Sequence, residues 1–414
     1  MAIPVEGEEY TIQPGDTLER IAARAYGDAI LWPRIWKANQ TRLRSGDPNL
    51  ILPGEVIQIP VLAERLPPDI ASANRDQDAM TIILDGLEIR PTTGSIIRTI
   101  DTVANAYQAT FPWRLGVNPA LDKKIAPYSY TSVKALIGND VIVTGLNYGT
   151  EIEISQGVTA KISGYTATAD LVDSALKPPF EFNNITLEDI IKGIIEPLGF
   201  GVVFEVETGG KFDRVTARQG DTIFQFLSKL AKQREALLSC DTFGNIAITR
   251  ADTESAPVAA FEENVTPGVS GWGGKFDGRK RFNVYRAVGR SPLGEKEATV
   301  TDNLVPRARF TTIQADDETE GEIESAARWA RNKTLSDTLA FVLTVADFRN
   351  VGGELWRENT KVTVISPSMF LPNGFDFLIN RVKYVQGERG RRTELSLVPP
   401  TVYTQGEIEE PWQL

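Results

Sequence analysis

The chain has 414 residues, of which 42% are apolar and 24% are charged, and its formal net charge is −11. This length favours two to four domains, and the negative charge argues against binding of a phosphate backbone as the main activity. The sequence has no histidine and a single cysteine, Cys240. It therefore excludes imidazole catalysis, an intrachain disulfide and a cysteine metal cluster. We expect no cofactor and no metal, and we expect Cys240 to be a buried apolar residue.

The hydropathy pattern predicts neither a membrane-spanning helix nor a signal peptide. No apolar run approaches the roughly 18 residues that a membrane-spanning helix needs. Residues 1–9 lack the basic and apolar regions of a signal peptide. We therefore expect no stable membrane insertion, and we expect synthesis in, and release from, a cytoplasm.

Residues 1–61 carry a βααβ pattern. A capping box of Asp16 and Glu19 is predicted to begin the first helix, which follows the Pro14-Gly15 turn. The pattern predicts a strand, two helices, and a turn with a closing strand, at about 10–13, 16–28, 30–39 and 49–60.

This unit resembles a LysM domain, because Tyr10 to Leu18, Tyr26-Gly27-Asp28 and Asp47 to Pro60 stand in the expected order. The resemblance implies that N-acetylglucosamine chains lie between two loops. Turns and helix caps use the same residue types, so docking onto a neighbouring subunit is the alternative role of these loops. The candidate glycan-binding or docking residues are Gly15, Asp16, Thr17, Asn49, Leu50, Ile51 and Pro53.

A linker and a β-rich region follow. Residues 62–79 contain adjacent prolines and little periodicity, which predicts a semi-extended tether. Residues 80–179 contain short strand-like runs separated by the turn pairs Asp85-Gly86 and Thr93-Gly94, which predicts a barrel or sandwich. The region ends with the segment Gly164 to Leu176, which includes the string TADLVD.

Residues 180–255 are predicted to form a helix-hairpin insertion. One amphipathic helix begins near Thr186, a second begins near Thr222, and a hairpin turns at Asp241 to Asn245. The string Gln219 to Ile223 is similar to Gln13 to Leu18. A shared N-cap is the favoured interpretation, and a second, degenerate LysM-like unit is the alternative hypothesis.

Residues 256–403 form a second region of short predicted strands, with a helix over about 321–333. The acids of this helix come early and its bases come late, which complements the helix dipole, so a catalytic carboxylate pair is not favoured there. The polar tail, residues 404–414, is predicted to run over the surface or onto a partner.

Two basic clusters lie beside strands in this region. Nucleic-acid binding would require interleaved aromatic residues and a positive domain, so we expect either solvated strand ends or salt bridges across subunits to acidic runs such as 316–318 and 320–324. The subunit-interface candidates are Arg279, Lys280, Arg281, Arg389, Arg391 and Arg392.

Together with the runs 141–145 and 158–163, the Gly164 to Leu176 segment resembles the baseplate hub proteins of Mu-like contractile phage tails. The resemblance covers about residues 82–402. It implies a mostly β fold with α+β insertions, in which the LysM domain is followed by two tube-like β-barrel domains and the helix-hairpin insertion.

The resemblance also implies a function. We expect a non-enzymatic homotrimer, in a virion tail baseplate or related injection machine, that joins the hexameric tail tube protein to the trimeric central spike protein. The LysM module would dock onto other baseplate subunits or bind peptidoglycan, and DNA would only pass through the channel. Assembly would take place in the host cytoplasm. The alternatives are a LysM-targeted peptidoglycan hydrolase and a free peptidoglycan-binding adaptor.

Overall fold

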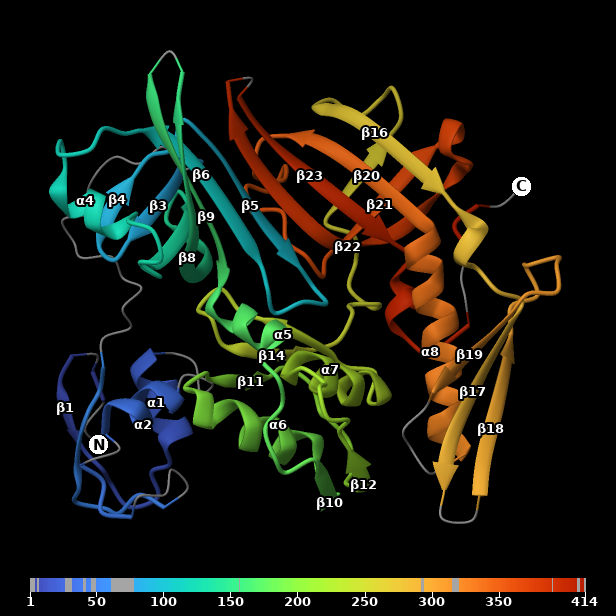
Figure 1. The fold of residues 1–414 in the computed structure, drawn as a ribbon, viewed down its shortest axis with the longest axis horizontal. Coiled ribbons are helices and arrows are strands. Elements are labelled where there is room, and N and C mark those ends of the chain that lie inside the picture. The colour runs from blue at the N-terminus through green and yellow to red at the C-terminus, as the bar shows by residue number, and fades with distance from the viewer. Residues whose placement is uncertain are drawn as a thin grey trace. The chain divides into compact units, whose positions relative to one another are not determined.

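The fold is taken from a computed structural model (Figure 1) that describes residues 4–5, 7–26, 32–39, 42–45, 50–60, 78–155, 157–291, 294–314, 320–388, 390–407 and 410–412. The chain divides into two compact units, Met1–Arg75 and Asp76–Leu414. Almost all of the predicted tether at 62–79 lies outside the described residues. No helix in the described part of the chain is long and apolar enough to cross a bilayer.

The first unit has the predicted βααβ order. Its strands β1 and β2 pair antiparallel, and the helices bury one apolar face against them, including Leu18, Ile21 and Ile35. Apolar residues that recur with the 3.6-residue period of a helix give each helix one buried face and one solvent-exposed face. The elements are β1 (Glu9–Thr11), α1 (Leu18–Tyr26), α2 (Trp32–Asn39) and β2 (Val56–Gln58).

Helix α1 is capped by Thr17, and the predicted cap at Asp16 is wrong. Thr17 Oγ1 accepts a hydrogen bond from the N–H of Arg20 at 3.3 Å. The Asp16 carboxylate instead accepts from the N–H of Gln13 at 2.9 Å and from the hydroxyl of Tyr10 at 2.7 Å. Asp16 therefore closes the turn before the helix, and the next residue performs the capping.

The second unit is built on a 13-stranded sheet formed by two groups of strands. The first group comes from residues 80–166 and the second from residues 259–398, and they meet along an antiparallel junction between β5 and β22. The strands are β3 (Met80–Leu84), β4 (Leu87–Ile89), β5 (Thr93–Thr99), β6 (Ala106–Pro112), β7 (Ser132–Ile137), β8 (Asp140–Ile154), β9 (Val158–Thr166), β15 (Ala259–Glu262), β16 (Val269–Phe276), β20 (Leu339–Ala346), β21 (Lys361–Ser366), β22 (Leu371–Gly387) and β23 (Gly390–Val398).

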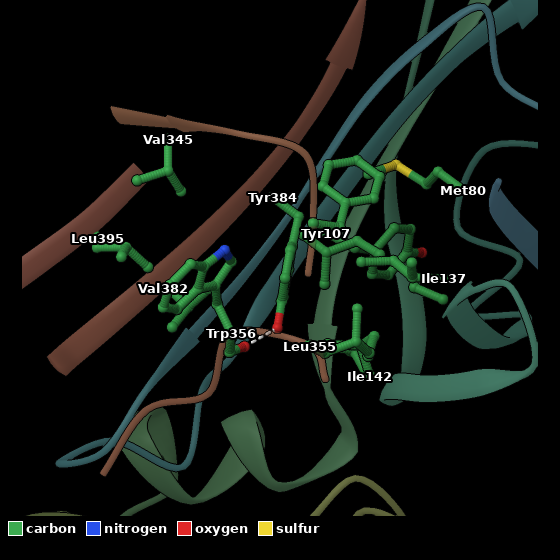
Figure 2. Packing of buried hydrophobic residues seen from close by; sticks show 14 of the residues in the cluster. Met80, Tyr107, Ile137, Ile142, Val345, Leu355, Trp356, Val382, Tyr384 and Leu395 are labelled. Carbon is green, nitrogen blue, oxygen red and sulfur yellow. Dashed lines mark hydrogen bonds between the residues drawn. The ribbon is translucent and has the colours of Figure 1, made fainter. Parts of the chain in front are cut away.

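The mostly β class is confirmed, but these strands do not close into two separate barrels. Their order is β16-β20-β23-β22-β5-β6-β9-β8-β7-β3-β4, with β21 on β22 and β15 on β21. Both groups contribute to one buried cluster. Figure 2 shows Met80, Tyr107 and Ile137 of the first group in the same packed cluster as Val382 and Tyr384 of the second, with the Tyr384 hydroxyl donating to the Trp356 carbonyl. The shared core makes the two groups one folded body.

The two predicted turn pairs of the first group had different outcomes. Asp85-Gly86 joins β3 to β4 with φ values of 42° and 83°, as a two-residue hairpin turn requires. The predicted turn at Thr93-Gly94 is wrong, because Gly94 lies inside β5. A Cβ on Gly94 would lie 2.8 Å from Met80 Sδ and 3.0 Å from the Gln108 carbonyl oxygen. Close packing, and not a turn, requires glycine there.

The helix-hairpin insertion has its own hydrophobic core. The two predicted helices and the hairpin are confirmed, and α6 is capped by Thr186, whose side chain accepts from the N–H of Asp189. The elements are β10 (Glu181–Ile185), α6 (Leu187–Ile195), η3 (Glu196–Leu198), β11 (Val202–Phe204), β12 (Phe212–Thr216), α7 (Ile223–Gln233), β13 (Leu237–Cys240) and β14 (Ile246–Thr249).

The turn before α7 repeats the local structure of the turn before α1. Asp221 accepts from the N–H of Arg218 at 3.0 Å, and Thr222 accepts from the N–H of Gln225 at 3.2 Å. However, α7 is followed by two strands, whereas the next described element after α1 is a second helix. The hypothesis of a second LysM-like unit is therefore wrong, and the similar strings encode a shared turn and N-cap.

A smaller layer lies beside the large sheet. Strand β17 lies between β18 and β19, and Ile323 and Ala327 of α8 bury against Ala287 and Val300. The predicted helix is confirmed, and it continues to Thr338. The elements here are η4 (Gly278–Lys280), β17 (Val284–Ser291), β18 (Gly294–Thr301), β19 (Phe310–Gln314) and α8 (Glu320–Thr338), and the remaining short helices of the unit are α4 (Pro119–Lys124), η2 (Ala167–Ala169), α5 (Asp170–Asp173), η5 (Pro367–Met369) and η6 (Pro400–Tyr403).

The described part of the C-terminal tail packs against its own chain. The Asn332 amide donates to the carbonyls of Thr404 at 2.8 Å and Gly406 at 3.0 Å. The ring of Trp412 lies 5.6 Å from that of Phe276 in an edge-on arrangement. These contacts hold the described residues of the tail against their own chain.

Cys240 is buried, as predicted. Its side chain is 1% exposed, and the Asn105 amide donates to its sulfur at 3.0 Å. Burial raises the pKa of the thiol, so the reactive thiolate is disfavoured. Cys240 is a packing residue at the end of β13.

Candidate interaction sites

Hydrogen bonds between backbone groups bring the two predicted LysM loops together. The N–H of Gly54 donates to the carbonyl of Ile12 at 2.8 Å, and the N–H of Ile12 donates to the carbonyl of Glu55 at 2.9 Å. Gly15 and Gly54 both have positive φ, at 87° and 91°, which glycine adopts without strain. Both loops are therefore fixed by backbone geometry.

The Asp16 carboxylate forms hydrogen bonds with residues of its own unit. Burial alone would raise the pKa of its carboxyl, but bonds from the Gln13 N–H, the Tyr10 hydroxyl and the Arg24 guanidinium hold that pKa below its usual range. Burial and the Asp16 contact raise the pKa of Tyr10. Asp16 is thus a structural anion, and Thr17 is occupied by capping α1.

The groups that the LysM loops expose are mainly aliphatic. Leu50 is 55% exposed and Leu52 is 41% exposed, and Val56 at the start of β2 is also exposed. Of the other predicted residues, Pro53 is exposed, Ile51 packs partly on the core, and Asn49 lies outside the described residues. The sequence analysis did not select Leu52 and Val56, although both stand in the segment that carried the LysM pattern.

Replacing Asp16 with asparagine is expected to destabilise the first unit by about 1–2 kcal/mol, because its charged hydrogen bonds are lost. The folded-state pKa of Asp16 is depressed, so its contribution is present above the unfolded value near 3.8 and is lost as the pH falls through the folded-state pKa. Hydrogen exchange of the α1 amides measured against pH checks both effects. An unchanged acid sensitivity in the Asp16→Asn variant would contradict the assignment.

The structure gives Arg279 and Arg281 of the first basic cluster different roles. Arg281 is paired with Asp302 at 2.7 Å and with Glu410 at 2.6 Å, and its side chain is only 13% exposed. Arg279 pairs with Asp277 at 2.5 Å but remains 86% exposed. Arg281 therefore links the segment around Asp302 to the C-terminal tail of the same chain.

An open hollow of about 860 Å³ lies beside this cluster. Its lining contains four arginines and no acidic residue, and two of them, Arg307 and Arg309, were not selected from the sequence because they lie in a separate loop. The lining residues are Gly278, Arg279, Arg281, Leu304, Val305, Pro306, Arg307, Ala308 and Arg309.

Arg307 and Arg309 carry the unneutralised charge of the hollow. The Arg309 guanidinium donates to the carbonyls of Gly278, at 3.0 Å, and Arg279, and it lies 5.1 Å from the centre of the Phe282 ring. Arg307 is exposed. Neither has a carboxylate partner among the residues that the structure describes.

The second basic cluster lies at the turn between β22 and β23, away from the hollow. Arg392 lies 3.6 Å from Glu394 of its own strand, and Arg389 lies outside the described residues, as does the acidic run 316–318. Glu324, predicted as an acidic partner across subunits, pairs with Arg328 one turn further along α8 at 2.7 Å. The interface roles of the candidates stay predictions, namely those of Arg279, Lys280, Arg281, Arg389, Arg391 and Arg392.

Three family models match separate parts of the chain. Residues 10–60 match the LysM domain. Residues 168–250, the helix-hairpin insertion with α5, match the second domain of the gp44-like baseplate hub proteins. Residues 319–406 match the fourth domain of the Mu phage baseplate assembly protein GpP. The resemblance to Mu-like baseplate hub proteins with an N-terminal LysM domain is confirmed.

Relatives of this hub-like chain extend over most of its length. The baseplate hub protein gp44 of Escherichia phage Mu is 24% identical over 331 residues, which cover 74% of this chain and 84% of the Mu protein. The 43 kDa tail protein of prophage MuSo2 from Shewanella oneidensis is 27% identical with a TM-score of 0.69, covering 79% of this chain and all of that protein.

A tail protein from Neisseria meningitidis MC58 shares the fold of the hub-like chain. It is 18% identical with a TM-score of 0.69, and the match covers 79% of this chain and 98% of that one. Over most of its length the chain is therefore similar to baseplate hub and tail proteins of phages.

Proposed function

We propose that this hub-like protein assembles as a homotrimer that joins the hexameric tail tube to the trimeric central spike in a virion baseplate. The observation that carries the proposal is the match of 79% of this chain to the whole length of a prophage tail protein at 27% identity. No chemical step is proposed. DNA would pass through the channel without stable binding, as the net charge of −11 favours.

The large sheet supports this role. Two strand groups, from residues 80–166 and 259–398, lie side by side in each chain. Three chains would therefore present six such groups, which suits contact with a sixfold tube on one side and a threefold spike on the other.

Sedimentation equilibrium tests the stoichiometry, with an expected mass of three times the 45.6 kDa of one chain. Virions produced without the gene are expected to lack an attached spike, and restoring the full-length chain is expected to restore the spike. A protein that stays monomeric at all concentrations and is absent from purified particles would overturn the proposal in favour of a free peptidoglycan-binding adaptor.

For the LysM module we propose docking onto another baseplate subunit. Leu50, Leu52 and Val56 expose aliphatic surface, and apolar contacts of this kind are typical of the centre of a protein interface. Peptidoglycan binding is the second candidate, because the same side chains could cover the apolar face of a sugar.

Replacing both Leu50 and Leu52 with serine is expected to reduce incorporation into particles by roughly thirtyfold, since two exposed leucines each contribute on the order of 1 kcal/mol when buried. Quantitative mass spectrometry of purified virions measures the effect. The variant Val5→Ser, also at an exposed aliphatic residue of this unit, is the control. Normal incorporation together with lost pull-down on purified cell wall would assign the surface to glycan instead.

A further inference from the structure

The tip of the β8–β9 hairpin presents acidic and apolar side chains to solvent. Glu151, Ile152, Glu153 and Ile154 are all exposed, with Ile154 at 78%. Strand geometry places alternate residues on opposite faces, so one face of the tip is acidic and the other is aliphatic. Glu151 pairs with Lys161 at 2.8 Å, whereas Glu153 has no ion pair among the described residues.

The hollow near Arg307 has the complementary composition. Arg307 and Arg309 are cationic without a carboxylate partner in the described part of the chain. Leu304 on its wall is 55% exposed, and Phe310, which follows Arg309, is 69% exposed. The surface therefore offers two positive charges beside aliphatic and aromatic groups.

The hairpin tip and the hollow cannot meet within one chain. Figure 1 shows the tip of β8 and β9 at the far end of the second unit from β17 and β19, whose first residues adjoin the hollow. Any contact between the two surfaces must therefore join different molecules. A contact between two unlike surfaces of identical chains is heterologous, and it forms a ring when the rotation closes.

We propose that the β8–β9 tip of one copy docks into the arginine-lined hollow of the next copy. Glu153 would approach Arg307 and Arg309, and Ile152 and Ile154 would pack on Leu304 and the neighbouring loop. The inference rests on the proposed homotrimer, since three such contacts close its ring, and it names the surfaces that hold that ring together.

Charge reversal of the full-length protein tests the contact. The variants Glu153→Arg and Arg307→Glu are each expected to weaken self-association by at least about tenfold in sedimentation equilibrium, as a like-charge contact across an interface would. The double variant Glu153→Arg/Arg307→Glu reverses both partners and is expected to recover most of the loss. Since both residues are exposed, neither change should disturb folding, which circular dichroism checks.

Two matched controls carry the same charge changes at exposed residues elsewhere, Glu205→Arg and Lys211→Glu, and they are expected to associate as the wild type does. Unchanged association of both single variants, with a trimeric wild type, would overturn the contact alone. A monomeric wild type would overturn the contact and the trimer together. Normal trimers whose Arg307→Glu variant fails to enter particles would assign the hollow to a different acidic protein and also overturn the contact.

Discussion

Replacing Arg98 with methionine is expected to lower the free energy of unfolding of the second unit by about 3 kcal/mol, since the loss of this partner leaves the largely buried charge of Glu358 uncompensated. Arg98 lies on β5 and is 7% exposed. Its Nε donates to Glu358 Oε1 at 2.5 Å, and its two terminal nitrogens donate to the carbonyls of Ile142 at 3.0 Å and Cys240 at 2.8 Å.

This one side chain thus connects both strand groups of the large sheet with the helix-hairpin insertion. Urea unfolding followed by tryptophan fluorescence measures the loss. The control is Arg90→Met, because Arg90 is 64% exposed and lies 3.5 Å from Glu88, and surface pairs contribute about 0–1 kcal/mol. Adding Glu358→Gln to Arg98→Met is expected to recover part of the stability. Equal stability of the Arg98 and Arg90 variants would show that the buried network is not needed.

Replacing Gly164 with alanine is expected to cost about 3 kcal/mol or more, at the upper end of the range for overpacking. A Cβ at this position would lie 1.9 Å from the carbonyl oxygen of Leu146 on β8 and 2.9 Å from the Tyr107 ring on β6. The backbone of β8 must move to admit it, which breaks the pairing of Asn147 with Gly164. Thermal unfolding measures the cost.

The same substitution at Gly157, near the far end of the same strand pair, provides the comparison. No atom lies within 4 Å of a Cβ built there, so Gly157→Ala is expected to change stability by less than about 0.5 kcal/mol. Gly145→Ala is expected to behave like Gly164→Ala, because its Cβ would lie 1.9 Å from the Tyr165 carbonyl oxygen. Wild-type stability of both strand variants would refute the steric argument.

The sequence predicted the elements whose causes are local. The amphipathic spacing of α6 and the Asp85-Gly86 turn depend on residues that are near one another in the chain, and both are confirmed. Gly94 was misassigned because its cause is distant: Met80 and the Gln108 carbonyl occupy the space of its missing side chain. Pattern alone does not contain such contacts.

The candidate sites also differ in whether the residues that form them are close together in the sequence. The LysM loops could be located because turn residues mark them. Of the four arginines that line the hollow, only Arg279 and Arg281 were predicted from the sequence. Arg279 to Arg281 form a visible run, but Arg307 and Arg309 join them only through the fold. The two expected barrels became one sheet because the pairing of β5 with β22 is between segments that are far apart in sequence.

That pairing also sets the order in which the molecule can be completed during translation. Strand β5 leaves the ribosome as an open edge, and its partner β22 begins roughly 270 residues later, which corresponds to tens of seconds at ordinary elongation rates. Unpaired edges recruit strands from other molecules. Nascent chains of this protein are therefore expected to depend on chaperone protection until Leu371 and the strand that it begins have emerged.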